Sequence, residues 1–205
     1  MDSKIADALD LIQAEFEENK ITPAEYGSKV VTYFDKCTNI DHVSSLIGYL
    51  ICDESGSGIK LAKDVAEKAL LQKKSNSYGL VYRGVETISE TAEMLLLADC
   101  FAGYSKPQDR DTFLKIYKLA LDAAKEAFDY HLLAMNLVSA CKNIEDPTID
   151  SDFELTKDLI KKAVDLYVAG SVESGVNDLL YMAKITLKDK DLVKYLTAIK
   201  KKLKK

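Results

Sequence analysis

Three stretches of the sequence resemble one another: LAKDVAEKAL (Leu61–Leu70), LKIYKLALDAAKEAF (Leu114–Phe128) and LTKDLIKKAVDLY (Leu155–Tyr167). In each, apolar residues return every three or four positions, which is the spacing of one helix face. Lysines fall on the opposite side and alanines among the apolar positions, so each stretch predicts an amphipathic helix. These helices open near Ile59, Asp111 and Asp152, and a fourth, lysine-rich helix opens near Asp191.

A second type of helix lies between these stretches: TAEMLLLADC (Thr91–Cys100), LAMNLVSACK (Leu133–Lys142) and VNDLLYMAKI (Val176–Ile185). Ala98, Ala140 and Ala183 hold matching positions in them, 42 and 43 residues apart. Small residues that recur at one helical position let neighbouring helices approach closely, and a two-helix unit of this length is within the range of helical solenoid repeats. Strict alternation of apolar and polar residues is rare, so we expect no sheet.

The alternation of these helices over residues 59–205 resembles tetratricopeptide-type helical repeats in its layout. The W-x2-L-G-x2-Y core and the closing proline of that repeat are absent, and the period exceeds its usual length of about 34 residues. The sequence looks more like the divergent bacterial arrays whose units open with an acidic turn and continue as A-x-x-x-Y-x-x-A. The resemblance implies a right-handed stack of helix pairs and a protein-binding role, and it assigns no functional residues.

Residues 1–54 predict three further helices. Ile5, Leu9, Ile12 and Phe16 lie on one helix face, and a third helix is expected from about Asp41 to Asp53. The second helix begins at TPAE (Thr22–Glu25), which offers an N-cap, a proline at the first helical position and a capping-box glutamate. Because three amphipathic helices leave an apolar face that must be buried, we expect them to dock on the array.

The expected fold is therefore all-α, with about eight or nine helices. An N-terminal three-helix region (residues 1–54) precedes a helical-repeat array (residues 59–205), a right-handed α–α superhelix of about three helix pairs that ends in the lysine-rich helix. The alternative is a separate three-helix subdomain hinged at SGSG (Ser55–Gly58), the clearest flexible break in the chain.

Further boundary signals agree with this division. Thr87 with Glu90 and Ser151 with Glu154 form capping-box patterns, and Gly103 and Gly170 stand where helices should end. The connection over residues 72–85 is longer than usual and contains several apolar residues, so we expect it to be irregular and packed down.

The charge distribution bears on the class of partner. The net charge is −5, which argues against nucleic acid as the partner, since nucleic-acid binders are usually basic. Residues 1–26 hold seven acids and two lysines, whereas residues 184–205 hold nine lysines and two aspartates. Solvated helix faces are the simplest interpretation of both ends.

The compartment can also be predicted. The first residues carry three aspartates and no apolar signal stretch, and no apolar run is long enough to span a membrane. The four cysteines, Cys37, Cys52, Cys100 and Cys141, form no CxxC pair, so we expect free thiols in the cytoplasm.

The residues that could carry chemistry have simpler structural interpretations. The pairs Asp109/Asp111, Asp150/Asp152 and Asp189/Asp191 could bind a hard cation, but each precedes a helix, where an acid caps the N-terminus. His42 and His131 lack the neighbours of a zinc site, and Cys100 and Cys141 fit a helix seam. GSGIK (Gly56–Lys60) lacks the phosphate-loop spacing. We therefore predict no catalytic, cofactor-binding or metal-ligating residues, and no enzyme.

The function predicted from the sequence is non-catalytic binding of another protein, as an adaptor, a chaperone-like protein or an inhibitor of immunity type. One version is an acidic inhibitor that masks a basic target through the N-terminal helices. Some of the eleven tyrosines could line the binding surface, although the sequence does not say which. The alternative function is binding of nucleic acid or an anionic surface through the C-terminal lysines.

Overall fold

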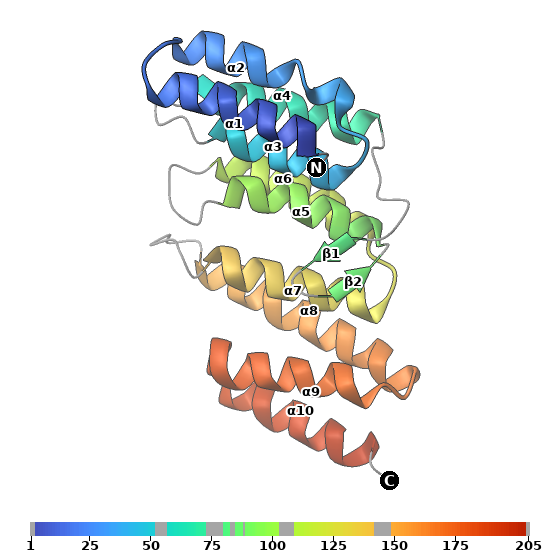
Figure 1. Ribbon diagram of the computed structural model, residues 1–205. Coiled ribbons are helices and arrows are strands. Elements are labelled where there is room, and N and C mark those ends of the chain that lie inside the picture. The colour runs from blue at the N-terminus through green and yellow to red at the C-terminus, as the bar shows by residue number, and fades with distance from the viewer. Residues whose placement is uncertain are drawn as a thin grey trace. The chain divides into compact units, whose positions relative to one another are not determined.

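The computed structural model describes residues 3–51, 57–72, 80–82, 85–87, 89–102, 109–141 and 149–203. These residues form ten α-helices, slightly more than the expected eight or nine, and the all-α fold class is confirmed (Figure 1). The chain divides into two compact units: residues 1–88, 96–102 and 108–116 form the first, and residues 89–95, 103–107 and 117–205 form the second. The division into residues 1–54 and 59–205 stays a prediction.

The first unit contains α1 (Ser3–Glu17), α2 (Pro23–Val31), the 3₁₀ helix η1 (Phe34–Lys36), α3 (Ile40–Ile51) and α4 (Ser57–Leu71). Helix α2 packs on α1, α3 and α4, and α3 also packs on α4. Leu9 of the predicted α1 stripe is fully buried, and the Phe16 ring stacks on Tyr26 with ring centroids 4.7 Å apart. The apolar faces of the first three helices are thus covered by one another and by α4.

Helices α5 (Glu90–Ala102) and α6 (Arg110–Ala123) each contribute one part to each unit. The rest of the second unit consists of α7 (Ala127–Cys141), α8 (Ile149–Ala169), α9 (Glu173–Tyr181), the π-helix η2 (Met182–Leu187) and α10 (Lys190–Leu203). Within it, α7 packs on α8, α8 on α9, and α9 on α10. Helices two apart also touch, because α7 contacts α9 and α8 contacts α10. Ala183 is fully buried, as close helix packing requires.

The expectation that the chain has no sheet is wrong at one place. Strands β1 (Leu80–Tyr82) and β2 (Val85–Thr87) form a two-stranded antiparallel hairpin in which Val81 pairs with Glu86. The hairpin lies in the long connection before α5, so the expected irregular segment contains extended backbone. Three-residue strands are too short for the alternation of apolar and polar residues to reveal them in the sequence.

One of the three predicted capping boxes is confirmed. Thr22 and Glu25 form the expected capping box: the Thr22 amide donates to Glu25 Oε2 at 2.8 Å, and the Glu25 amide to Thr22 Oγ1 at 3.3 Å. The other two predicted boxes are wrong. Thr87 lies in β2, and the Ser89 hydroxyl accepts instead from the Ala92 amide at 3.4 Å. Helix α8 begins at Ile149, so Ser151 lies inside it.

The stretch Leu114–Phe128 is not one helix, because α6 ends at Ala123 and α7 begins at Ala127. Asp129 stabilises the connection between α6 and α7, because its carboxylate accepts hydrogen bonds from the amides of Lys125 and Glu126 at 2.9 and 3.0 Å. Gly170 directly follows α8, as expected of a helix end, and the next residue, Ser171, has a left-handed φ of 58°. The Val172 amide then bonds to the Tyr167 carbonyl at 2.8 Å, which closes a Schellman motif. Gly103, the other predicted helix end, lies outside the described residues.

Candidate binding surface of the C-terminal helices

Two of the three Asp-x-Asp pairs contain helix caps, as predicted. Asp109 Oδ1 accepts the Thr112 amide at 2.9 Å, and Asp189 Oδ1 accepts the Leu192 amide at the same distance. The side chains of Asp150 and Asp152 lie outside the described residues. Where side chains are described, no three His, Cys, Asp or Glu residues are close enough together to hold a metal ion.

Each of the two capping aspartates also pairs with a lysine of an earlier α-helix, with one other α-helix between that helix and the one it caps. Lys63 of α4 pairs with Asp109 before α6, and Lys157 of α8 pairs with Asp189 before α10 at 3.1 Å. Although partial burial works against ionisation of Asp109, bonds from Lys63 and the Thr112 amide hold its pKa below 3.8. The Leu192 amide and Lys157 lower the pKa of Asp189 in the same way. Both carboxylates are thus occupied in fixing helix ends.

His131, Cys100 and His42 have structural surroundings. Burial lowers the pKa of His131, whose Nδ1 lies 3.1 Å from the Tyr167 hydroxyl. Burial raises the pKa of Cys100 to about 11, and its Sγ lies 3.3 Å from Ser44 Oγ. His42 lies in the first turn of α3, where its amide donates to Asn39 Oδ1 at 3.0 Å. Cys52 and the Cys141 side chain lie outside the described residues.

A lysine-rich surface forms where the chain passes from α9 into α10. Helix α9 continues without a break into η2, which ends at Leu187 and is followed by Lys188 with a left-handed φ of 53°. A lysine rarely adopts this conformation, which costs about 1–2 kcal/mol. Asp189 follows at once and caps α10. The turn therefore fixes the lysines of η2 relative to those of α10.

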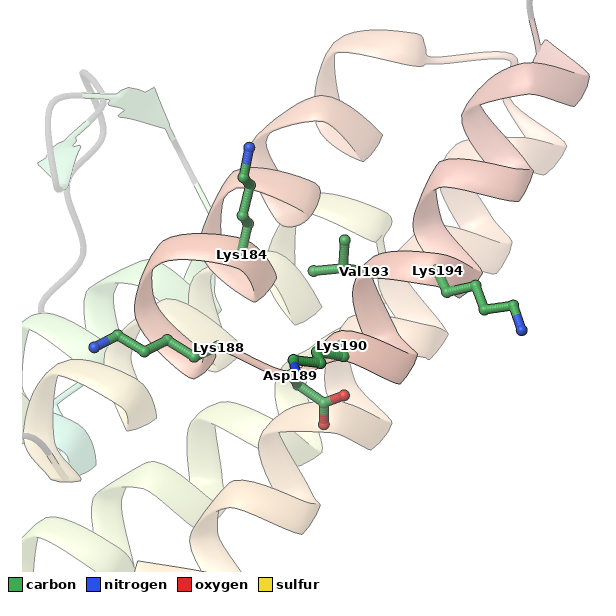
Figure 2. A pocket seen from close by; sticks show the side chains of 6 residues that line it. All are labelled: Lys184, Lys188, Asp189, Lys190, Val193 and Lys194. Atoms are coloured by element: carbon green, nitrogen blue, oxygen red, sulfur yellow. The ribbon is translucent and has the colours of Figure 1, made fainter.

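An open pocket of about 420 Å³ lies between η2 and α10, lined by Lys184, Lys188, Asp189, Lys190, Val193 and Lys194. Figure 2 shows Val193 between the two segments, with Lys184 and Lys194 extending away from each other on either side of it. The ammonium groups of Lys184, Lys188 and Lys194 therefore do not converge on one point. Val193 and the aliphatic parts of the lysines make the inner surface largely apolar.

The lysines of this pocket are not held in ion pairs by the described residues. The one acid in the lining, Asp189, already pairs with Lys157 and caps α10. Within the described ranges, none of the four lining lysines forms an ion pair. The rim thus presents four positive charges to an incoming ligand.

Two apolar side chains are exposed beside these lysines. Tyr181 is 68% exposed and Ile185 is 50% exposed, whereas Met182 and Ala183, on the other side of the same segment, are buried. Tyr181, Lys184, Ile185 and Lys188 thus form one exposed strip along the end of α9 and η2. We refer to this strip together with the pocket as the C-terminal surface. Contiguous apolar surface bordered by polar groups is typical of binding sites, whereas single exposed apolar residues are common on any protein.

Sequence reasoning found only part of this surface. It identified the excess of lysines from residue 184 onward, but it did not single out Tyr181 among the eleven tyrosines. The spacing of Lys184, Lys188, Lys190 and Lys194 was a visible signal. The π-helix and the left-handed Lys188, which turn these lysines to the two sides of one pocket, have no local sequence signature.

The chain was compared with protein-family models, with curated proteins and with solved structures, and none of them matches it. No helix in the described ranges combines the length and the apolar character needed to cross a membrane.

Proposed function

We propose that the protein is a non-catalytic helical-repeat module of the cytoplasm that binds another protein through its C-terminal surface. The observation that carries this proposal is the exposure of Tyr181 and Ile185 among lysines that form no ion pair with a described residue. Tyrosine supplies a large contact area at small entropic cost, and it is enriched among the residues that dominate binding energy. Covering Tyr181 and Ile185 would supply the apolar part of such an interface, and the lysines its polar rim.

The repeat architecture is part of this proposal. Contacts between α7 and α9 and between α8 and α10 are those of stacked helix pairs, and they support a tetratricopeptide-like, right-handed superhelix over residues 59–205. The ties Lys63–Asp109 and Lys157–Asp189 support it as well. Both lysines follow a leucine by two positions in the matching stretches LAKD and LTKD, and both reach a cap two helices later. Equivalent contacts at equivalent positions are the expected consequence of a structural repeat.

The C-terminal surface is a better candidate for the partner-binding site than the acidic N-terminal helices. Several acids of that region are already engaged: Glu15 pairs with Lys29, Glu18 with Lys20, and Asp10 accepts a bond from the Tyr49 hydroxyl. Glu25 serves the capping box of α2. Two of these acids are therefore paired with lysines, and the carboxylates of Asp10 and Glu25 are held by bonds within the chain.

The test is affinity capture from native lysate with a matched pair of double variants. Tyr181→Ser with Ile185→Ser removes the exposed apolar groups of the C-terminal surface. Leu11→Ser with Leu71→Ser removes two residues that are 69% and 85% exposed in the first unit. We expect one stoichiometric protein to be retained by the wild type and the control, and to be lost from the first variant. Equal retention by both variants would contradict the proposal.

A second candidate function is binding of nucleic acid or of an anionic surface, which the four lining lysines favour. Truncation after Leu187 is a poor test, because it removes the buried Leu192 and Leu196. Charge reversal of Lys184, Lys190 and Lys194 leaves the core intact. If the wild type binds single-stranded RNA or phosphatidylserine vesicles and the reversed variant does not, this function replaces the first one.

A further inference from the structure

We propose that the ligand of the C-terminal surface is an extended acidic segment of a protein, which carries an apolar side chain that enters the pocket over Val193. The inference rests on the proposed function and names the chemistry of the partner. It is based on three properties of the surface: divergent ammonium groups, an apolar inner wall and a net positive rim.

The arrangement of the lysines selects an extended ligand. Lys184 lies in η2, Lys188 follows η2 directly, and Lys190 and Lys194 lie in α10. Figure 2 shows the side chains of Lys184, Lys188 and Lys194 pointing in different directions. A single phosphate or carboxylate could meet one of these groups but not several at once. Carboxylates spaced along a peptide could meet them one after another, so several weak contacts would add up.

The apolar inner surface of the pocket favours an apolar side chain between the carboxylates of the peptide ligand. A pocket of about 420 Å³ with Val193 inside it has room for a leucine or a phenylalanine of the ligand. Ile185, half exposed beside Lys184, extends the apolar area along the strip. Burial of an apolar side chain gives affinity that persists in salt, whereas the lysine contacts weaken as ionic strength rises.

Protein is favoured over nucleic acid by the charges around the surface. Asp178 is exposed in α9 and Asp191 is exposed in α10, and the chain as a whole carries a net charge of −5. A phosphate backbone carries a charge at every nucleotide, so a strand that spans the surface would bring phosphates to Asp178 and Asp191 as well as to the lysines. An acidic peptide of limited length can place its carboxylates at the lysines alone.

The surface is held in shape before any ligand arrives. Asp189 joins the end of η2 to α10 by capping the helix, and its pair with Lys157 ties the turn to α8. Lys188 is bonded back through its amide to the Ala183 carbonyl. Little ordering of the backbone is then required on binding, which reduces the entropic cost for a short peptide.

The test measures binding of a fluorescently labelled, glutamate-rich peptide with one central phenylalanine to the full chain by fluorescence anisotropy. The comparison ligands are the same peptide with serine for phenylalanine, the same peptide with glutamine for glutamate, and oligouridine. We expect the two altered peptides to bind about tenfold more weakly or worse, and a moderate rise in salt to weaken the parent peptide severalfold. Equal affinity for all three peptides, or tighter binding of oligouridine, would overturn the inference.

Protein variants locate the site. Charge reversal at Lys184, Lys190 and Lys194 should weaken the parent peptide by about tenfold or more. Reversal at the exposed Lys60, Lys118 and Lys125 makes the same change in net charge elsewhere and should have a much smaller effect. Val193→Asn should remove the preference for phenylalanine over serine. Circular dichroism and thermal unfolding show whether each variant folds; equal loss in both triple variants would refute a local site.

The outcomes separate this inference from the proposed function. If no acidic peptide binds, yet Tyr181→Ser with Ile185→Ser still loses its partner from lysate, the inference fails and the proposed function stands. If the acidic peptide binds in the way described, but that double variant keeps its lysate partner, the site stands and the proposed role of the C-terminal surface in capture fails.

Discussion

The ring of Tyr167 lies directly against the backbone of Gly175. A Cβ added to Gly175 would stand 2.6 Å from Cε1 of Tyr167 and closer still to Cε2 and Cζ, a separation that real Cβ atoms do not reach. The Tyr167 hydroxyl in turn lies 3.1 Å from Nδ1 of the buried His131, whose ring meets the tyrosine edge to face. One glycine thus allows α9 to approach α8 at the point where α7 contributes its histidine.

Gly175→Ala should destabilise the protein by about 1–3 kcal/mol, because the methyl group must displace a packed aromatic ring. Urea unfolding measures this as a lower midpoint with an unchanged slope. Gly48→Ala is the control: it is exposed in α3 with nothing within 4 Å of the added Cβ, so it should stabilise by up to about 1 kcal/mol. Similar effects of the two substitutions would show that the ring does not constrain Gly175.

The buried His131 should make stability depend on pH. Burial lowers its pKa below 6.5, although Asp178 acts in the opposite direction, so the unfolded chain binds a proton more readily than the folded one. The contribution of His131 to stability is therefore fully present above about pH 6.5 and is lost as the pH falls toward its lower folded-state pKa. Unfolding free energies measured from pH 7.5 to pH 5 should decline.

His131→Gln keeps a hydrogen-bonding group for Tyr167 and should flatten this decline, whereas His42→Gln, at a partly exposed position, should not. The same slope in the wild type and in His131→Gln would rule out His131 as its source. Asp109 and Asp189 do not affect this measurement, because their hydrogen bonds and lysine partners lower their pKa values further from this pH range.

Cys100 should be inert to alkylation in the folded protein. Its pKa of about 11, raised by burial, leaves almost no thiolate at neutral pH, and the thiolate is the reacting species. Iodoacetamide at pH 7.5, followed by peptide mass spectrometry, should label Cys100 and the buried Cys37 only after unfolding in urea. Rapid modification of Cys100 in the native chain would indicate a reactive site that the packing does not show.

Asp189 contributes to stability in two ways, by capping α10 and by pairing with Lys157, and substitutions can separate them. Asp189→Asn retains a cap for α10 but loses the ion pair, and should cost about 0.5–1 kcal/mol. Asp189→Ala loses both, and should cost about 1 kcal/mol more. A double-mutant cycle with Lys157→Gln measures the ion pair itself, in thermal or urea unfolding. A coupling energy near zero would mean that the lysine only lies near the aspartate.

Asp189 should also make stability depend on pH, in the way expected of a carboxyl group whose pKa is lowered by folding. Because the folded-state pKa lies below 3.8, the stabilisation is present above that value and is lost as the pH falls through the lower folded-state pKa. Wild type and Asp189→Asn should therefore converge in stability under strongly acidic conditions and differ most near neutral pH.

The amino-acid sequence by itself determined the helical class and several helix starts. Thr22 with Glu25, Asp109 and Asp189 cap helices in the way that their local sequences predict, because a cap needs only the side chain and amides three residues away. The periodic apolar positions likewise predicted which faces would be buried, since a helix of 3.6 residues per turn places them together whatever its neighbours are.

Only the tertiary structure decided the features that depend on distant segments. Three contacts join residues whose proximity no local pattern encodes. They are the pairing of β1 with β2, the packing of Tyr167 against Gly175, and the ion pair of Lys157 with Asp189. The C-terminal surface belongs to this group. Its lysines are visible in the sequence, but a π-helix and a left-handed Lys188 set them around Val193, and packing of α10 on α8 and α9 holds that geometry in place.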